Sequence, residues 1–203
     1  AIGDIEAKPI ETCPPEWETE LCKSLRCRDP LAAEAMKERI EKIRSQRNSI
    51  GSRVDVHVTN LPIGIGEPWF DGIEPALGGA YFAIPACRGV EFGRGFSAVT
   101  MTGLEHNSPW GGSSANPIQL GERPDGSLAG MTSGSDIHAR IALKPPSSIA
   151  QEQTTLDLEE DGQKQLVVKG RHDPVLGPRG VSVAIAMTKI VLADLLLRKR
   201  DAF

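Results

Sequence analysis

The spacing of apolar residues changes back and forth between two periods along this chain, and that change limits the folds that it can adopt. Residues 54–59 and 137–144 alternate between apolar and polar side chains, which is typical of strands with one wet face. Residues 30–48 and 183–200 carry apolar side chains every three or four positions, as amphipathic helices do. The two kinds of segment do not follow each other as regular strand–helix–strand units, so an α+β fold is favoured over a doubly wound sheet.

The helix expected over residues 30–48 has recognisable ends. Asp29 is a common residue at the position that caps a helix, and Pro30 fits the first helical position, where its missing N–H is not needed. The apolar side chains within residues 33–43 fall on one face. The run 48–51 ends in glycine, which favours a helix end there.

The rest of the chain gives weaker indications of structure, from turn residues and short apolar runs. We expect a loop-dominated lead-in over residues 1–28, a helix over 71–83 capped by Asp71, a strand over 90–102, a long loop over 103–127 and a short strand over 166–169.

Composition excludes several classes of partner. The chain has 203 residues, of which 25% are charged and 39% hydrophobic, and one sizeable core is favoured over two small ones. The formal net charge of −4 gives no reason to expect nucleic acid or an anionic membrane as a partner. No apolar stretch approaches the roughly 18 residues that cross a bilayer. We expect the most apolar window, residues 190–197, to belong to a buried helix.

The start of the chain and its cysteines indicate its setting. It begins at Ala1 without an initiator Met or a signal peptide, so we expect the middle of a longer protein. Cys13, Cys22 and Cys27 lie close together without a CxxC pair or a nearby His, so no metal site is expected. A disulfide between Cys13 and one of the other two stays open, but reduced cysteines in a cytoplasmic protein are favoured.

The segment 144–149 is a candidate binding turn. Lys144 ends a strand, Pro145 and Pro146 stiffen the backbone, and Ser147 and Ser148 offer hydroxyl and backbone N–H groups. Such a turn can hold a phosphate or the edge of a flavin ring. The alternative is a rigid polar turn without a ligand.

The segment 170–174 places three chemically active side chains in a row. Arg171 could bind a phosphate or carboxylate at two points, and Asp173 could accept a proton. His172 lies between them, and Pro174 prevents regular structure from continuing. The alternative is a local ion pair that fixes a loop.

Other residues are weaker candidates for a functional role. Arg88 lies in a glycine-flanked turn, where a backbone comes close to some partner. His57, His106 and His138 have no partner at catalytic spacing along the sequence and are interpreted as surface residues. No GxSxG, HExxH, P-loop or strand-following GxGxxG pattern occurs, which removes the commonest hydrolase, NTPase and Rossmann functions.

Taken in order, these segments resemble the chorismate synthase family. The similarity covers nearly the whole chain, from Ile2 to the last helix, and suggests that the family's N-terminal portion is missing. Six motifs in family order carry it: residues 51–54, 64–71, 85–93, 142–149, 170–174 and 186–194.

The resemblance implies a fold and a reaction. Residues 1–203 would be the C-terminal portion of a single domain with a β-α-β sandwich fold. Members are lyases that remove phosphate and a ring proton from 5-enolpyruvylshikimate 3-phosphate by 1,4-anti elimination. The product, chorismate, is the last common intermediate of the shikimate pathway to aromatic amino acids. The reaction needs reduced FMN, and the enzymes are typically homotetramers. Whether NADPH or a separate reductase reduces the flavin stays open.

The resemblance also assigns residues to roles. Arg171 and Asp173 would be catalytic, with Arg171 on the flavin or substrate and Asp173 near flavin N5, where it would transfer a proton. The other residues implied in FMN binding are Pro85, Ala86, Ala129, Lys144, Pro145, Pro146, Ser147 and Ser148.

This chain departs from the family pattern at several positions. Pro85 stands where the family often has Asn, Pro146 where many members have Thr, and Ala129 where a Gly usually lies in a glycine-richer run. The missing N-terminal portion would carry two catalytic histidines and several arginines that bind substrate, so the chain alone is expected to be inactive. A binding module that has lost the chemistry and an unrelated phosphate-binding domain are the alternatives.

Overall fold

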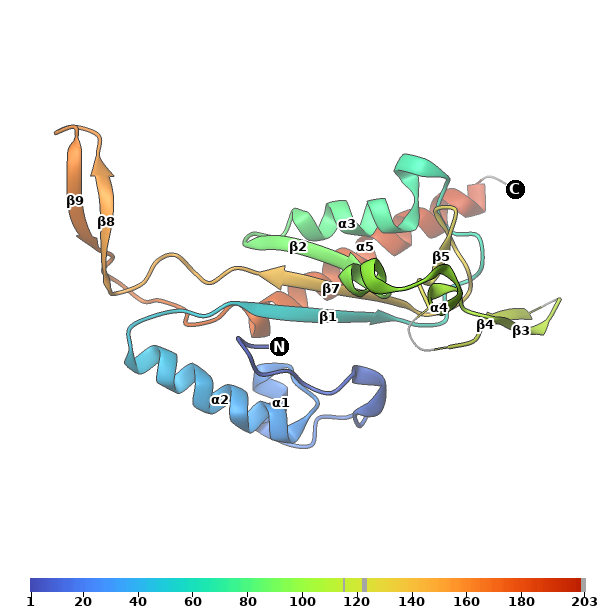
Figure 1. The fold of residues 1–203 in the computed structure, drawn as a ribbon, viewed down its shortest axis with the longest axis horizontal. Helices are drawn as coiled ribbons and strands as arrows, with labels where there is room; N and C mark the ends of the chain where they lie inside the picture. The colour runs from blue at the N-terminus through green and yellow to red at the C-terminus, as the bar shows by residue number, and fades with distance from the viewer. Residues whose placement is uncertain (115, 122–123, 202–203) are drawn as a thin grey trace. The chain divides into compact units, whose positions relative to one another are not determined.

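A computed structural model describes residues 1–114, 116–121 and 124–201 (Figure 1). The chain divides into two compact units, each built from two separate stretches. Unit 1 comprises Ala1–Arg53 and Leu143–Gly180, and unit 2 comprises Val54–Ala142 and Val181–Phe203. The expectation that the chain is part of a single domain stays a prediction.

Unit 1 begins with a 3-10 helix and two α-helices. These are η1 (Ile10–Thr12), α1 (Glu20–Leu25) and α2 (Pro30–Ser45). The side chain of Asp29 caps α2, because Oδ1 accepts hydrogen bonds from the backbone N–H groups of Leu31 (3.1 Å) and Ala32 (3.3 Å). The capped helix expected after Asp29 is therefore confirmed, although it ends at Ser45.

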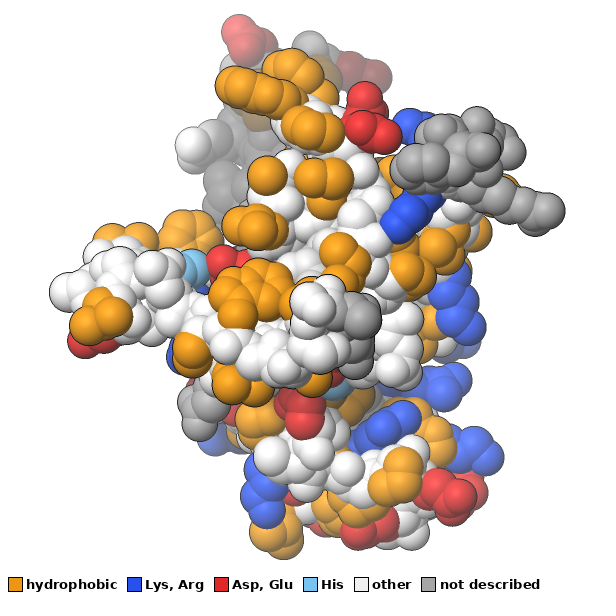
Figure 2. All heavy atoms as spheres, turned by 90° about the vertical axis from the view of Figure 1, so that its right-hand side faces the viewer, with side chains coloured by type: hydrophobic (Ala, Val, Ile, Leu, Met, Phe, Trp, Pro, Cys, Tyr) orange, Lys and Arg blue, Asp and Glu red, His pale blue; other side chains and the backbone are white. Residues whose placement is uncertain are grey.

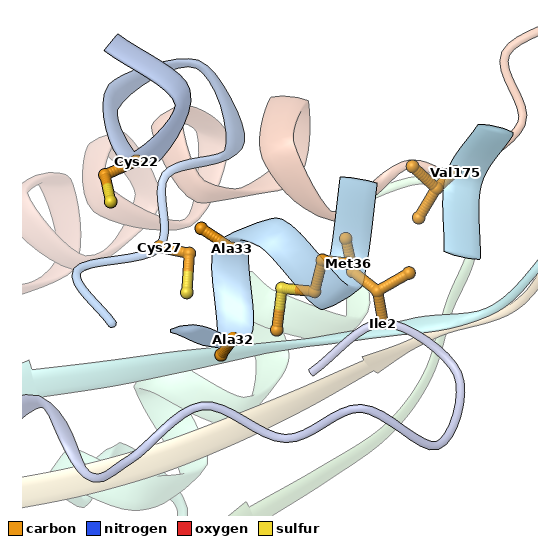
Figure 3. Packing of buried hydrophobic residues seen from close by; sticks show 7 residues of the cluster. All are labelled: Ile2, Cys22, Cys27, Ala32, Ala33, Met36 and Val175. Carbon is orange, nitrogen blue, oxygen red and sulfur yellow. The ribbon is translucent and has the colours of Figure 1, made fainter. Parts of the chain in front are cut away.

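A small apolar core fills unit 1, and Figure 3 shows it gathered around α2. Met36 is 3% exposed, and full burial of a side chain of this size contributes about 1.5–3 kcal/mol. All four cysteines of the chain are free thiols. The core consists of Ile2, Cys22, Cys27, Ala32, Ala33, Met36 and Val175.

The second stretch of unit 1 contains a hairpin of strands β8 (Glu152–Asp157) and β9 (Gly162–Val167). The strands pair antiparallel, from Glu152 opposite Val167 to Asp157 opposite Gly162. The sequence predicted only the end of the second strand. The first was missed because its side chains are largely exposed and polar, so they lack a regular apolar alternation.

Unit 2 is built around a three-stranded sheet in the order β1-β7-β2. Its strands are β1 (Ser52–Val58), β7 (Ile137–Leu143) and β2 (Cys87–Phe92). Helices α3 (Ile73–Phe82) and α5 (Gly177–Asp201) lie on one side of it (Figure 1). The Tyr81 hydroxyl of α3 lies 2.8 Å from the Thr188 hydroxyl of α5, which joins the two helices.

Two expected elements of unit 2 have different ends. Asp71 does not cap α3, because it belongs to the 3-10 helix η2 (Trp69–Asp71) and Gly72 takes the cap position. The strand expected over residues 90–102 stops at Phe92. Gly93 and Gly95, both with φ of +53°, turn the backbone into the 3-10 helix η3 (Gly95–Thr100).

The long loop expected over residues 103–127 contains regular structure. Helix α4 (Gly103–His106) starts with a capping box between Thr102 and Glu105. Strands β3 (Trp110–Ser113) and β4 (Asn116–Gln119) then form an antiparallel hairpin. A second, shorter hairpin follows, made of β5 (Ser127–Leu128) and β6 (Met131–Thr132).

Helix α5 corrects two expectations. Gly177–Lys199 is long and apolar enough to cross a membrane, with a mean hydropathy of 1.9, although length and composition are the only basis for this. Only 22% of its most apolar window is buried, so the expected buried helix is mostly exposed. Ala184, Thr188 and Leu195 form its buried stripe, whereas Ile190 is 64% and Leu197 60% exposed.

Hydrophobic side chains are also exposed elsewhere in unit 2. Figure 2 shows them gathered on the upper part of the face that carries η2 and the end of α5. In η2, Trp69 is 83% and Phe70 88% exposed. Trp69 has a φ of +66°, a rare conformation for a bulky side chain.

Candidate functional site

The predicted binding turn after β7 lies against a short segment that follows α2. The Ser49 hydroxyl donates a hydrogen bond to the carbonyl oxygen of Pro146 at 2.5 Å. A Cβ on Gly51 would lie 3.3 Å from the carbonyl oxygen of Leu143 and 3.5 Å from Cδ of Pro145. Residues 49–51 therefore pack closely against the start of this turn.

The side chains of this turn face water. Lys144, Pro145, Ser147 and Ser148 are exposed, and Pro146 is half-buried. Within the described parts of the chain, the Lys144 ammonium has no hydrogen-bond or ion-pair partner. An exposed ammonium without a partner on a turn stiffened by two prolines can bind an anionic group.

The second predicted turn is fixed to the same segment. The backbone N–H of Ile50 donates to the carbonyl oxygen of Pro174 at 2.8 Å. Ser49 and Ile50 thus contact the two predicted turns, one each. Gly170, with a φ of +125° that side chains rarely adopt, provides the bend that precedes Arg171.

Arg171 and Asp173 have different surroundings within unit 1. Arg171 is exposed, and its guanidinium pairs with no described carboxylate. The Asp173 side chain is 30% exposed, and its Oδ2 lies 2.5 Å from Nη1 of Arg179. The local ion pair considered as an alternative therefore exists, but its cation is Arg179 rather than Arg171.

Arg179 was missed by sequence reasoning. The sequence predicted that the last helix begins at Val183, which placed Arg179 in a loop. Helix α5 begins at Gly177, so Arg179 lies in its first turn and faces back toward Asp173. The proline at position 178 was the available indication, because proline is common in the first turn of a helix.

His172 has a fixed orientation. Its Nε2 lies 3.0 Å from the carbonyl oxygen of Val168. A carbonyl only accepts, so Nε2 carries the hydrogen. Nδ1 is buried and has no hydrogen-bond partner among the residues that the structure describes. His172 thus fixes the turn between its two reactive neighbours.

The predicted flavin contacts of unit 2 lie at opposite ends of α3. Pro85 and Ala86 follow its C-terminal end, whereas Ala129 lies in the β5–β6 turn. The backbone of Gly130 accepts a hydrogen bond from Ile73 at the start of α3 (2.8 Å). Because α3 has 10 residues, the two positions are separated by about 15 Å along the helix.

Both predicted alanines have a left-handed backbone. Ala86 has a φ of +72° and Ala129 a φ of +53°. Such a conformation costs a residue with a Cβ about 1–2 kcal/mol, and strain of this kind gathers at functional sites. A flavin contact at these positions stays a prediction.

The β5–β6 turn also packs closely against the segment before η2. A Cβ on Gly66 would lie 2.6 Å from the carbonyl oxygen of Gly130. Glu74, in the first turn of α3, is a further carboxyl beside this hairpin. The pKa of Glu74 is raised, mainly because the carboxyl is buried and also because Asp125 lies nearby. A hydrogen bond with Ser127 offsets part of this rise.

The histidines interpreted as surface residues have partners. His57 Nε2 lies 2.8 Å from Asp136 Oδ2, and the His57 side chain is only 15% exposed. Its ring stacks on His138 of the neighbouring strand, with centroids 4.4 Å apart. His106 Nε2 lies 3.7 Å from Asp125 Oδ1. The partners are distant in sequence, so spacing along the chain could not reveal them.

The fold and the two turns of unit 1 describe an α+β protein with cationic side chains suited to an anionic ligand. Comparisons with known proteins identify the family to which the chain belongs within this class. The family model described as chorismate synthase matches residues 2–197. The chain therefore belongs to the chorismate synthase family, as its motifs predicted.

Individual relatives agree with the family assignment. The chain is 41% identical over 203 residues to the chorismate synthase of Roseiflexus castenholzii, with 99% of this chain and 55% of that protein covered. It is 41% identical over 201 residues to the chorismate synthase of Aeropyrum pernix, with 97% and 52% covered. The chain thus spans about half the length of the curated relatives that it matches.

A solved structure confirms the fold. A crystal structure of a chorismate synthase superposes with a TM-score of 0.74 at 27% identity, covering 98% of this chain and 55% of that one. The predicted α+β fold of this family is therefore confirmed.

Proposed function

We propose that the chain is part of an enzyme with chorismate synthase activity. The reaction breaks the C–O bond to phosphate and a C–H bond of 5-enolpyruvylshikimate 3-phosphate, giving chorismate and phosphate without net oxidation. Reduced FMN, when bound, supplies electron density as the phosphate leaves. One observation carries the proposal: the two turns with the family's Lys144 and Arg171–Asp173 motifs are bonded to the adjacent residues Ser49 and Ile50.

The side chains of unit 1 suit this chemistry. The substrate and FMN both carry phosphate, and departure of phosphate gathers negative charge. Lys144 and Arg171 offer cationic groups that no described carboxylate neutralises, so they are able to bind such anions. Asp173 provides a carboxylate that can hold the proton removed during the reaction.

The predicted flavin contacts follow from the same proposal. Pro145, Pro146, Ser147 and Ser148 would present backbone and hydroxyl groups to FMN beside Lys144. Ala86 and Ala129 would touch the flavin through backbone in the left-handed conformation, and Pro85 would contact it beside Ala86. The exposed state of most of these residues leaves them accessible to a ligand.

The experiment uses a hybrid protein, because the chain spans about half of its relatives. The hybrid combines this chain with the part of the R. castenholzii chorismate synthase that it does not match. We expect it to bind FMN and to form chorismate and phosphate under anaerobic conditions with reduced FMN. The R. castenholzii part alone is the control. A folded hybrid that neither binds FMN nor forms chorismate, while the complete R. castenholzii enzyme does, would contradict the proposal.

The remaining features of the proposal concern assembly and setting. The enzyme would be a cytoplasmic homotetramer, and NADPH would serve as reductant if it reduces its own flavin. Analytical ultracentrifugation of the hybrid measures its oligomeric state. Incubation with NADPH in the absence of any reductase tests whether the hybrid reduces its own flavin, and a flavin that stays oxidised would assign this step to a separate enzyme.

A further inference from the structure

We infer that Arg179 is a positioning residue for Asp173 in the proposed elimination. The inference rests on the proposed function and adds a residue to it. Arg179 Nη1 contacts Oδ2 of Asp173 at 2.5 Å. Oδ1 of the same carboxylate has no hydrogen-bond partner among the described residues.

This one-point contact gives the two carboxylate oxygens different tasks. Oδ2 is occupied by the guanidinium, which fixes the plane and direction of the carboxylate. Oδ1 keeps its lone pairs available for a proton. A general base must be held in one geometry to act, and Arg179 supplies that restraint without blocking the reactive oxygen.

The backbone between the two residues is anchored, so the contact is built into unit 1. Pro174 accepts a hydrogen bond from Ile50 at 2.8 Å, and Val175 is 8% exposed in the core. A Cβ on Gly177 would lie 2.9 Å from Cβ of Ser52, so the start of α5 sits close to β1. The N–H of Arg179 donates to the carbonyl oxygen of Leu176 at 3.1 Å, which sets the first turn.

Stability alone does not account for this ion pair. The Arg179 side chain is 64% exposed, and exposed pairs contribute little to folding. Another exposed arginine of α5 offers a comparison, since Arg198 Nη2 lies 2.8 Å from Asp194 Oδ2 and its Nη1 lies 4.0 Å from Asp71 Oδ1, with 59% of its side chain exposed. If an exposed arginine of α5 that pairs with an aspartate mattered only for the fold, the two arginines would respond alike to substitution.

The test measures kcat and KM of the hybrid protein with reduced FMN. We expect Arg179→Ala to lower kcat at least about tenfold with KM changed less than about threefold, because a positioning residue acts on the reacting state. Arg179→Lys should recover part of kcat by keeping the charge. Arg198→Ala should leave both constants within about twofold. Circular dichroism melting curves check that each variant folds.

A double-mutant cycle decides whether Arg179 acts through Asp173. In an Asp173→Asn background, adding Arg179→Ala should lower kcat by less than about twofold. An equal loss in both backgrounds would overturn the inference, and so would a change confined to KM, which would indicate direct substrate binding. An unsubstituted hybrid that forms no chorismate would count against the proposed function itself. Normal turnover in Arg179→Ala would count against the inference alone.

Discussion

Asp173 and Arg171 are two residues apart, yet among the described residues only Asp173 has a charged partner. The carboxylate is held by Arg179, and the Arg171 guanidinium is exposed to solvent. A held carboxylate suits proton transfer, and an accessible guanidinium suits the binding of an anion from solution. Substitutions at the two positions should therefore change different kinetic constants.

Asp173→Ala should lower turnover of the hybrid protein at least about a hundredfold, because general-base groups contribute about that much. Folding should change little, since the side chain is partly exposed and outside the core. Steady-state kinetics and thermal melting measure the two effects. Activity within about threefold of the unsubstituted hybrid would refute the role of Asp173.

Arg171→Ala should weaken the binding of FMN or of substrate, because the guanidinium is exposed and unpaired within the described chain. Fluorescence titration with FMN and the KM for substrate measure the two affinities. Lys37→Ala, which removes an exposed cation on α2, is the control. Unchanged affinity for both ligands would show that Arg171 binds neither.

Individual residues were predictable to the extent that their partners are near in sequence. Arg171 and Asp173 stood out because three active side chains are consecutive. Arg179 escaped because its distance from Asp173 depends on where α5 begins, and helix ends are poorly determined by apolar spacing. The His57–Asp136 contact escaped because it joins β1 to the residue before β7, a long-range pairing that no local pattern reports.

Among the elements of unit 1, α2 depends most clearly on one side chain. The Asp29 carboxylate accepts hydrogen bonds from three backbone N–H groups, those of Lys8, Leu31 and Ala32. The hydrogen bond from Lys8 contributes most, and together the three bonds hold the pKa of Asp29 below its usual range, although burial acts in the opposite direction. The ionised form is therefore the one that stabilises the folded state.

Asp29→Ala should reduce the free energy of unfolding by about 1 kcal/mol, the usual loss for a helix cap. Urea denaturation of the 203-residue chain measures the change. Glu34→Ala on the exposed side of α2 is the control and should have almost no effect. An unchanged midpoint for Asp29→Ala would mean that the cap does not hold the helix.

The same carboxylate makes stability depend on pH. Because the folded-state pKa is lowered, the contribution is complete above the unfolded pKa of about 4 and is lost as the pH falls through the folded value. Asp29→Asn keeps an acceptor oxygen but cannot titrate. Its loss of stability between about pH 5 and pH 2 should be smaller than that of the parent chain, and parallel curves would contradict the assignment.

Across the whole molecule, helices and strands with regular apolar spacing were predictable, whereas contacts between stretches far apart in the sequence were not. Strand β7 was predicted to within one residue of its observed end, because every second side chain in it is buried. The exposure of α5 was not foreseen, since an apolar helix is normally buried, whereas this one has most of its apolar window exposed. The sequence carries no local signal for the two compact units, because they depend on contacts between stretches far apart in the sequence.

The exposed side of α5 should govern the behaviour of the chain alone in solution. Exposed apolar surface drives association, so the chain should self-associate with rising concentration and bind a hydrophobic dye. Ile190→Glu and Leu197→Glu, at positions 64% and 60% exposed, should reduce both without lowering the melting temperature. Leu195→Glu, at a position 4% exposed, should unfold the chain.

Sedimentation velocity and dye fluorescence measure this prediction. Flotation with phospholipid vesicles separates self-association from binding to a bilayer, which the length and hydropathy of Gly177–Lys199 would also permit. A chain that stays monomeric and does not bind the dye would show that the exposed side of α5 has no such effect.

Because each unit consists of two separate stretches of the chain, unit 1 cannot complete its folding early during synthesis on the ribosome. Unit 1 needs both Ala1–Arg53 and Leu143–Gly180, and its core gains Val175 only after most of the chain has been translated. The first helices must therefore wait, incompletely packed, for more than half of the sequence to emerge. Nascent chains stalled before that point should remain sensitive to proteases and attractive to chaperones.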